Sequence, residues 1–117
     1  MTDREELEIA VKALSSKKAL DIKALKVEEL TILANYFVIA SAASTTQVKA
    51  LADEVEYKLS QAGVTPKSIE GEQGKTWIVL DYIDVIVHIF TEETRSFYQL
   101  EHLWADGTPV DISGMVD

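Results

Sequence analysis

Residues 74–104 read GKTWIVLDYIDVIVHIFTEETRSFYQLEHLW. Two apolar runs, 76–81 and 84–90, are separated by a very short turn, which predicts an antiparallel β-hairpin. Thr91 follows the second run and can cap a helix that we expect to end at Trp104. A hairpin cannot fold alone in water, so this segment requires further strands and a covering layer. It therefore decides the fold class of the whole chain.

The two hairpin strands have different faces, because successive strand residues point to opposite sides of a sheet. One face is aliphatic and is expected to lie under helices. It carries Ile78, Leu80, Val85, Val87 and Ile89. The other face mixes aromatic, apolar and acidic residues. It carries Trp77, Val79, Asp81, Asp84, Ile86, His88 and Phe90. Such a mixture suits a binding surface, although cover by another element of the chain would explain it equally well.

Patterns outside the hairpin predict the other elements. Thr2 and Glu5 have capping-box spacing, and apolar residues at helical spacing follow them, which predicts a helix over residues 3–16. Strands are expected over 19–27 and 36–40, with an edge strand over 67–72. A further helix should begin after Ser44 and stop at Gly63. In the last helix, Phe97, Leu100 and Trp104 are spaced for one face. The predicted fold is α/β (α+β), a mixed sheet of about five strands with flanking helices.

Length and composition exclude several classes of protein. The 117 residues fit one domain, which we place at 1–107, with 108–117 as a mobile C-terminal tail. The chain has no cysteine and carries a net charge of −9. Repulsion from phosphate disfavours broad nucleic-acid binding. The acidic charge would attract a basic protein, although on charge alone it is explained more simply as keeping the domain soluble. No apolar run is long enough to span a membrane, and the acidic start is unlike a signal peptide, so a cytoplasmic location is expected.

The sequence contains no recognisable catalytic or metal-binding pattern. His88 and His102 lie on different predicted elements, so no metal and no cofactor are expected. Asp81 and Asp84 flank a tight turn, where carboxylates more often cap turn amides than work as a pair. The helix start at residues 44–46 could hold an anion with its backbone amides, although a plain N-cap explains these residues more simply.

The chain resembles the Iojap-like ribosomal silencing factor family from about Leu20 to Trp104. The motifs that carry the resemblance are Tyr36-Phe37-Val38-Ile39-Ala40, Ser44, Gln47-Val48, Glu70-Gly71, Trp77-x-x-x-Asp81, Asp84-Val85-x-Val87-His88-x-Phe90 and Arg95-x-x-Tyr98-x-Leu100-Glu101-x-Leu103-Trp104. The resemblance implies a nucleotidyltransferase-like topology without the catalytic motifs. It also implies binding to the large ribosomal subunit through ribosomal protein fourteen, which would block joining of the small subunit and repress translation when nutrients are short.

The mixed hairpin face and the resemblance together predict a partner-binding surface. Its members are Trp77, Asp81, Tyr82, Asp84 and His88, with Arg95, Tyr98 and Glu101 as an extension. Tyr82 is included for its place at the hairpin tip, although strict alternation assigns it to the other face. For Trp104 we favour a place in the core.

Two features depart from the family pattern. Residues 41–44 lack the glycine usual before the second helix, and Ile83 stands where a glycine often makes the hairpin turn. Ile83 leaves the turn type open, because β-branched residues disfavour positive φ. Two other functions stay open: a nucleotide-binding protein or residual nucleotidyltransferase enzyme, and a module that forms a homodimer through the mixed face.

Overall fold

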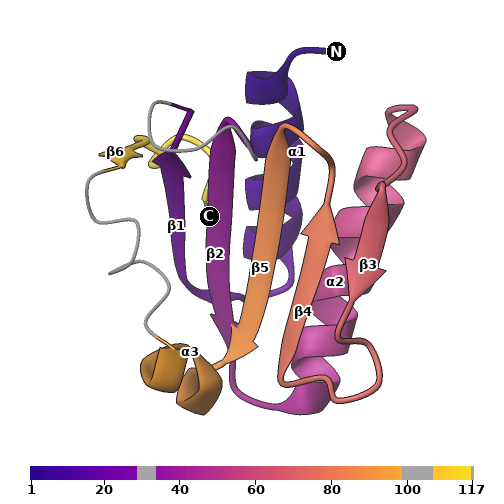
Figure 1. Ribbon diagram of the computed structural model, residues 1–117, viewed down its shortest axis with the longest axis vertical. Coiled ribbons are helices and arrows are strands. Elements are labelled where there is room, and N and C mark those ends of the chain that lie inside the picture. Colours follow the sequence, from indigo (N-terminus) through magenta and orange to yellow (C-terminus); the bar gives the residue numbers. More distant parts are fainter. Residues whose placement is uncertain (29–33, 99–106, 117) are drawn as a thin grey trace.

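The computed structural model describes residues 1–28, 34–98 and 107–116 (Figure 1). Its elements are α1 (Asp3–Ser16), β1 (Leu20–Lys26), β2 (Tyr36–Ala42), α2 (Thr45–Gln61), β3 (Ser68–Glu70), β4 (Trp77–Asp81), β5 (Val85–Thr91), α3 (Glu92–Tyr98) and β6 (Thr108–Pro109). Six strands form one sheet in the order β3-β4-β5-β2-β1-β6. The pair β2–β5 is parallel and the other neighbours are antiparallel. The predicted mixed α/β class is confirmed.

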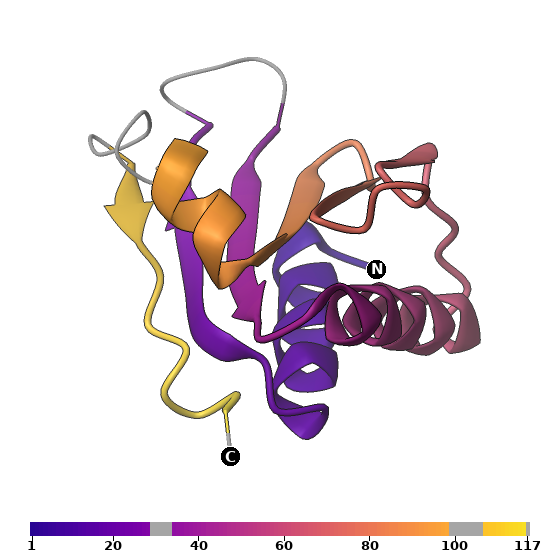
Figure 2. The same cartoon turned by 90° about the horizontal axis from the view of Figure 1, so that it is seen from below.

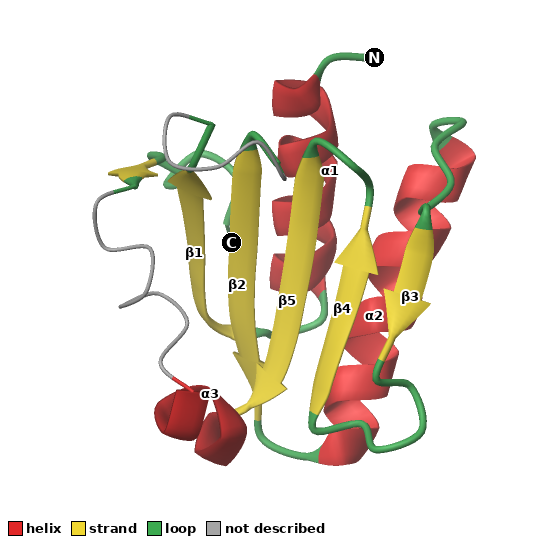
Figure 3. Ribbon diagram, in the orientation of Figure 1, coloured by secondary structure: helices red, strands yellow, loops and turns green. Residues whose placement is uncertain are grey.

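The helices divide between the two sides of the sheet. Figure 2 shows α1 and α2 on one side and α3 on the other, and Figure 3 shows α3 at the carboxyl ends of β2 and β5. The larger core lies between the sheet and the first two helices. From the hairpin it takes Ile78, Leu80, Val85, Val87 and Ile89. The aliphatic face was therefore assigned correctly. None of the helices described is long and apolar enough to cross a membrane.

The predicted starts of α1 and α2 are confirmed. The hydroxyl of Thr2 accepts from the Glu5 amide, and the Glu5 carboxylate accepts from the Thr2 amide, each at 3.1 Å. Ser44 likewise accepts from the Gln47 amide at 3.1 Å. The Gln47 side chain instead accepts from the amide of Ala43 at 2.8 Å. The reciprocal bond is thus displaced by one residue, and it still satisfies a backbone donor beside the helix start.

The C-terminal segment contributes the sixth strand, where about five were expected. Thr108 and Pro109 pair with Lys26 and Leu25 of β1, and the amide of Val110 donates to the carbonyl of Ala24 at 2.9 Å. Val110, Ile112 and Met115 then pack against the larger core. The tail is thus attached to the sheet and the core rather than separate from the domain. Its mobility in solution stays a prediction.

The β4–β5 turn places Ile83 in the left-handed region, at φ 73°. Its side chain is 60% exposed, and its amide donates to the Asp81 carboxylate at 2.8 Å. Asp81 thus caps a turn amide, as expected. The amides of Asn35 and Tyr36 both donate to the carbonyl of Asp84. These bonds hold the start of β2 against the turn, so the strain at Ile83 accompanies a connection that joins β2 to the hairpin.

Gly71 sits where the β3–β4 connection passes close to β4. Its φ is +88°, and a Cβ added to it would lie 2.0 Å from the carbonyl oxygen of Trp77. We expect Gly71→Ala to lower the free energy of unfolding by about 2–3 kcal/mol, from backbone strain and steric overlap. Gly74→Ala is the matched control, since nothing lies within 4 Å of its added Cβ. Denaturant melts should leave that variant within about 0.5 kcal/mol of the parent. Equal losses in both variants would contradict the argument.

Candidate functional site

The side of the sheet opposite α1 and α2 carries an aromatic cluster. We call Phe37, Trp77, Ile86, His88 and Phe90 the aromatic face. The ring of Trp77 stacks on Phe90 at a centroid distance of 4.8 Å, and its indole nitrogen donates to Nδ1 of His88 at 3.2 Å. Phe37 meets His88 edge to face at 5.1 Å. Because Trp77 and Ile86 are half-buried while the other three are buried, the indole is held in place by its neighbours and still accessible.

His88 supports the face from beneath. It is 8% exposed, and burial lowers its pKa to about 4. Since Nδ1 accepts the Trp77 hydrogen bond, the neutral ring carries its proton on Nε2. That nitrogen is buried with no hydrogen-bond partner among the described residues. His88 therefore fixes the Trp77 ring and is not itself a surface contact.

The expected surface position of Tyr82 is wrong. Tyr82 is 5% exposed and belongs to the core beneath α1 and α2. Its amide donates to the carbonyl of Val85, so Tyr82 continues the alternation of β4 and turns to the helix side. Burial raises the pKa of its hydroxyl, and the charges of Glu56 and Glu6 add to the effect. Strict alternation gave the correct face, and the exception made for the hairpin tip was the error.

The two acidic residues of the predicted surface, Asp81 and Asp84, lie in different surroundings. Asp81 ends β4 and is half-buried, on the same side of the hairpin as Trp77. Asp84 is exposed, but it interacts with Asp3 of α1. Desolvation, the charge of Asp3 and a side-chain hydrogen bond with it raise the pKa of Asp84. Asp84 therefore associates with the helix layer rather than with the aromatic face.

Arg95 connects α3 to the sheet. It is 5% exposed, and Nη1 donates to the carbonyl of Asp21 at 2.6 Å and to the hydroxyl of Ser41 at 2.8 Å. Nη2 lies 3.4 Å from the Asp21 carboxylate. Asp21 has a φ of 47°, in a stretch of β1 where the pairing with β2 is irregular. Arg95 is thus a positioning residue that holds α3 and this irregular stretch together.

Phe97 is the surface residue that the sequence did not predict. Its side chain is 80% exposed, whereas the sequence had shown only that its spacing puts it on one helix face with Leu100 and Trp104. The spacing of Arg95 and Phe97 could have indicated this exposure, because residues two apart lie on nearly opposite sides of a helix. Since Arg95 faces the sheet, Phe97 faces away. The predicted site residue Glu101 and the predicted core residue Trp104 lie outside the described residues, as does the side chain of Tyr98.

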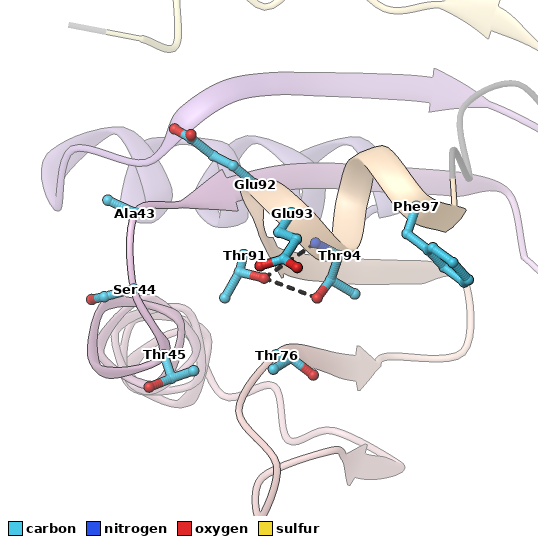
Figure 4. Close-up of a pocket in the computed structure, with 9 residues that line it drawn as sticks. All are labelled: Ala43, Ser44, Thr45, Thr76, Thr91, Glu92, Glu93, Thr94 and Phe97. Carbon is cyan, nitrogen blue, oxygen red and sulfur yellow. Dashed lines mark hydrogen bonds between the residues drawn. The ribbon is translucent and has the colours of Figure 1, made fainter.

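A pocket of about 580 Å³ lies where β2 and β5 end and α2 and α3 begin (Figure 4). It is lined by Ala43, Ser44, Thr45, Thr76, Thr91, Glu92, Glu93, Thr94 and Phe97. The Thr91 hydroxyl accepts from the Thr94 amide at 3.3 Å, which confirms Thr91 as the cap of α3. Ser44 is likewise used as the cap of α2. With both caps occupied and two carboxylates on the wall, the pocket is poorly suited to an anion.

In the described part of the chain, no group of three or more His, Asp or Glu side chains could hold a metal ion. The fold and the site together define a small α/β domain whose described surface carries a preorganised aromatic face on the sheet and an exposed Phe97 on α3.

Comparison with known proteins identifies the family. A family model described as "Ribosomal silencing factor during starvation" matches residues 1–117. The ribosomal silencing factor of Bacillus subtilis is 38% identical over 112 residues, which cover 96% of this chain and 95% of that protein. A crystal structure of a protein from Chromobacterium violaceum has a TM-score of 0.88 and 37% identity, covering 90% of this chain and 88% of the other. This chain belongs to the ribosomal silencing factor family, and the predicted resemblance is confirmed.

A more distant relative adds a functional clue. The mouse protein named "Mitochondrial assembly of ribosomal large subunit protein 1" is 30% identical over 102 residues, which cover 85% of this chain and 45% of the mouse protein.

The buried His88 should make the fold sensitive to acid. Its pKa falls from 6.5 in the unfolded chain to about 4 in the folded one, so the unfolded chain takes up the proton first as the pH falls. The stabilisation is therefore complete above pH 6.5 and is lost as the pH falls through about 4. Because of this shift in the pKa of His88, we expect the free energy of unfolding to decrease by about 3 kcal/mol between pH 7 and pH 4. His88→Phe should lack this part of the pH dependence in denaturant melts. Parallel profiles for the two proteins would refute the assignment.

Proposed function

We propose that this chain binds the large ribosomal subunit through ribosomal protein fourteen and blocks joining of the small subunit. The observation that carries the proposal is the aromatic face, an accessible indole set in a rigid cluster on a member of the ribosomal silencing factor family. The name of the mouse relative refers to the large subunit, which favours that subunit over the small one. Steric exclusion needs a tight and well-placed surface and no chemical step.

Trp77 is the central contact in this proposal. An aromatic residue contributes most to the binding free energy when it fills a pocket of the partner and loses its contact with water there. The stack on Phe90 and the hydrogen bond to His88 hold the indole in one orientation, so little side-chain entropy is lost on binding. Ile86 adds apolar area beside it, and Asp81 supplies a carboxylate for a basic partner. Phe97 extends the surface onto α3.

The remaining predicted contacts take other roles. His88 fixes Trp77, and Arg95 positions α3. Tyr82 is not part of the proposed binding surface because it is buried under the helices. Asp84 is not part of it because it faces Asp3. Contacts from Tyr98 and Glu101 stay predictions.

Overall charge favours the same partner. The chain carries 20 acidic and 11 basic residues, so a basic ribosomal protein would be attracted over a distance. Attraction of this kind speeds association and weakens with salt.

Sucrose-gradient sedimentation with separated ribosomal subunits tests the proposal directly. We expect the protein to migrate with the large subunit and not with the small one. When the protein is bound to large subunits before small subunits are added, fewer joined ribosomes should form. The purified ribosomal protein fourteen should compete for binding. Equal migration with both subunits, or with neither, would refute the proposal.

Trp77 and its strand neighbour Ile78 separate binding from folding. Trp77→Ala should weaken binding to the purified ribosomal protein by about 2 kcal/mol or more. It should cost the fold about 1–2 kcal/mol, because the ring is half-buried and donates one hydrogen bond. Ile78→Ala should cost the fold about 2–5 kcal/mol, since Ile78 is 0% exposed, while its folded fraction still binds. Denaturant melts and binding isotherms on both variants make the comparison.

Phe97→Ala provides a second variant in case Trp77→Ala folds poorly. With 80% of the Phe97 side chain exposed, its removal should leave the unfolding free energy within about 0.5 kcal/mol of the parent. Binding should still fall if α3 belongs to the docking surface. Full-strength binding by both folded variants would move the docking surface elsewhere on the molecule.

A further inference from the structure

A second pocket lies on the helix side of the molecule, away from the aromatic face. Its volume is about 540 Å³, within the range typical of small-molecule sites. The pocket is bounded by α1, the end of α2 and the C-terminal segment, and is lined by Ile9, Lys12, Ala13, Ser16, Lys58, Gly114 and Met115. Figure 2 shows the C-terminal segment running from β6 toward the helix layer, and Gly114 and Met115 of this segment line the pocket.

The pocket has an apolar floor. Ala13 is buried in the larger core, and Ile9 and Met115 pack against the same core while remaining partly exposed. The hydroxyl of Ser16 donates to the carbonyl of Ala13 at 2.8 Å, so its donor is already used. The floor can therefore hold an aliphatic or aromatic body but offers no free hydroxyl donor at this residue.

The charged groups at the pocket have one sign. Among the described lining residues, two are lysines and none is acidic, in a chain whose net charge is −9. Lys12 makes only an exposed ion pair with Glu8, at 3.0 Å, which contributes little. Lys58 forms no ion pair within the described residues, and its ammonium lies 5.8 Å from the ring centroid of Tyr57. The ammonium group of Lys58 is therefore available to a ligand, and that of Lys12 would exchange its exposed pair with Glu8 for one with the ligand.

We propose that this pocket binds a small amphipathic anion, a carboxylate joined to a short apolar body. The apolar body would cover Ile9, Ala13 and Met115, and the carboxylate would lie between the ammonium groups of Lys12 and Lys58. A neutral apolar ligand would leave the two cations uncompensated, and a small polar anion would gain nothing from the floor. Only a ligand with both parts uses the whole lining.

Titration of the full chain with sodium octanoate, followed by ¹H–¹⁵N NMR, tests the proposal. We expect shift changes confined to residues 9–16, Lys58 and residues 114–115. 1-Octanol has the same chain without the charge and should bind about tenfold more weakly. Acetate has the charge without the chain and should produce no localised changes. Octanol binding as tightly as octanoate, or changes scattered over the surface, would overturn the proposal.

Matched variants test the two lysines. The double variant Lys12→Gln/Lys58→Gln should weaken octanoate binding about tenfold. Lys67→Gln/Lys75→Gln changes the net charge equally at exposed positions outside the pocket and should leave binding unchanged. The NMR spectra also report whether each variant is folded. Equal affinity in the two double variants would overturn the proposal. An acidic helical peptide that displaces octanoate and binds far more tightly would assign the groove to a protein partner instead.

Discussion

The parallel pairing of β2 with β5 is the constraint on which the rest of the structure depends. All seven residues of each strand are paired, from Tyr36 with Val85 to Ala42 with Thr91. Because parallel neighbours end at the same edge of the sheet, this pairing brings the starts of α2 and α3 together. It also aligns Phe37 with Ile86 and Ile39 with His88, which joins the apolar residues of β2 to the aromatic side of the hairpin. The same pairing thus gives the hairpin a buried aliphatic face on one side and an aromatic face supported by β2 on the other.

Polar groups inside the sheet layer define the geometry of the candidate surface. A buried guanidinium is costly unless it is paired and hydrogen-bonded, and Arg95 meets that requirement through Asp21 and Ser41. The same contacts hold α3 against β1 and β2. His88 plays the equivalent role for Trp77, as its Nδ1 accepts the indole donor. The accessible groups thus depend on buried polar residues whose own exposure is small.

The two sides of the domain differ in chemistry. The aromatic face offers an apolar surface whose indole is held by Phe90 and His88, with Asp81 on the same side of the hairpin, which suits a basic macromolecule. On the helix side, Lys12 and Lys58 flank an apolar pocket of limited size, which suits a small anion. The sheet separates these surfaces, so each can be occupied without direct contact between the two ligands.

Local patterns in the sequence determined much of this protein. Capping residues and apolar periodicity set the starts of α1 and α2, and alternation assigned both faces of the hairpin, including the place of Trp77. These features depend on neighbours a few residues apart. Family motifs in the same segments also identified the ribosomal silencing factor family. Alternation also gave the helix-side face of Tyr82, which the exception for the hairpin tip overrode. Tertiary structure alone decided the pairing of Thr108 and Pro109 with β1 and the orientation that buries Arg95 and exposes Phe97. Each of these depends on which distant segment covers or pairs with the residue. A local sequence pattern does not predict such a contact.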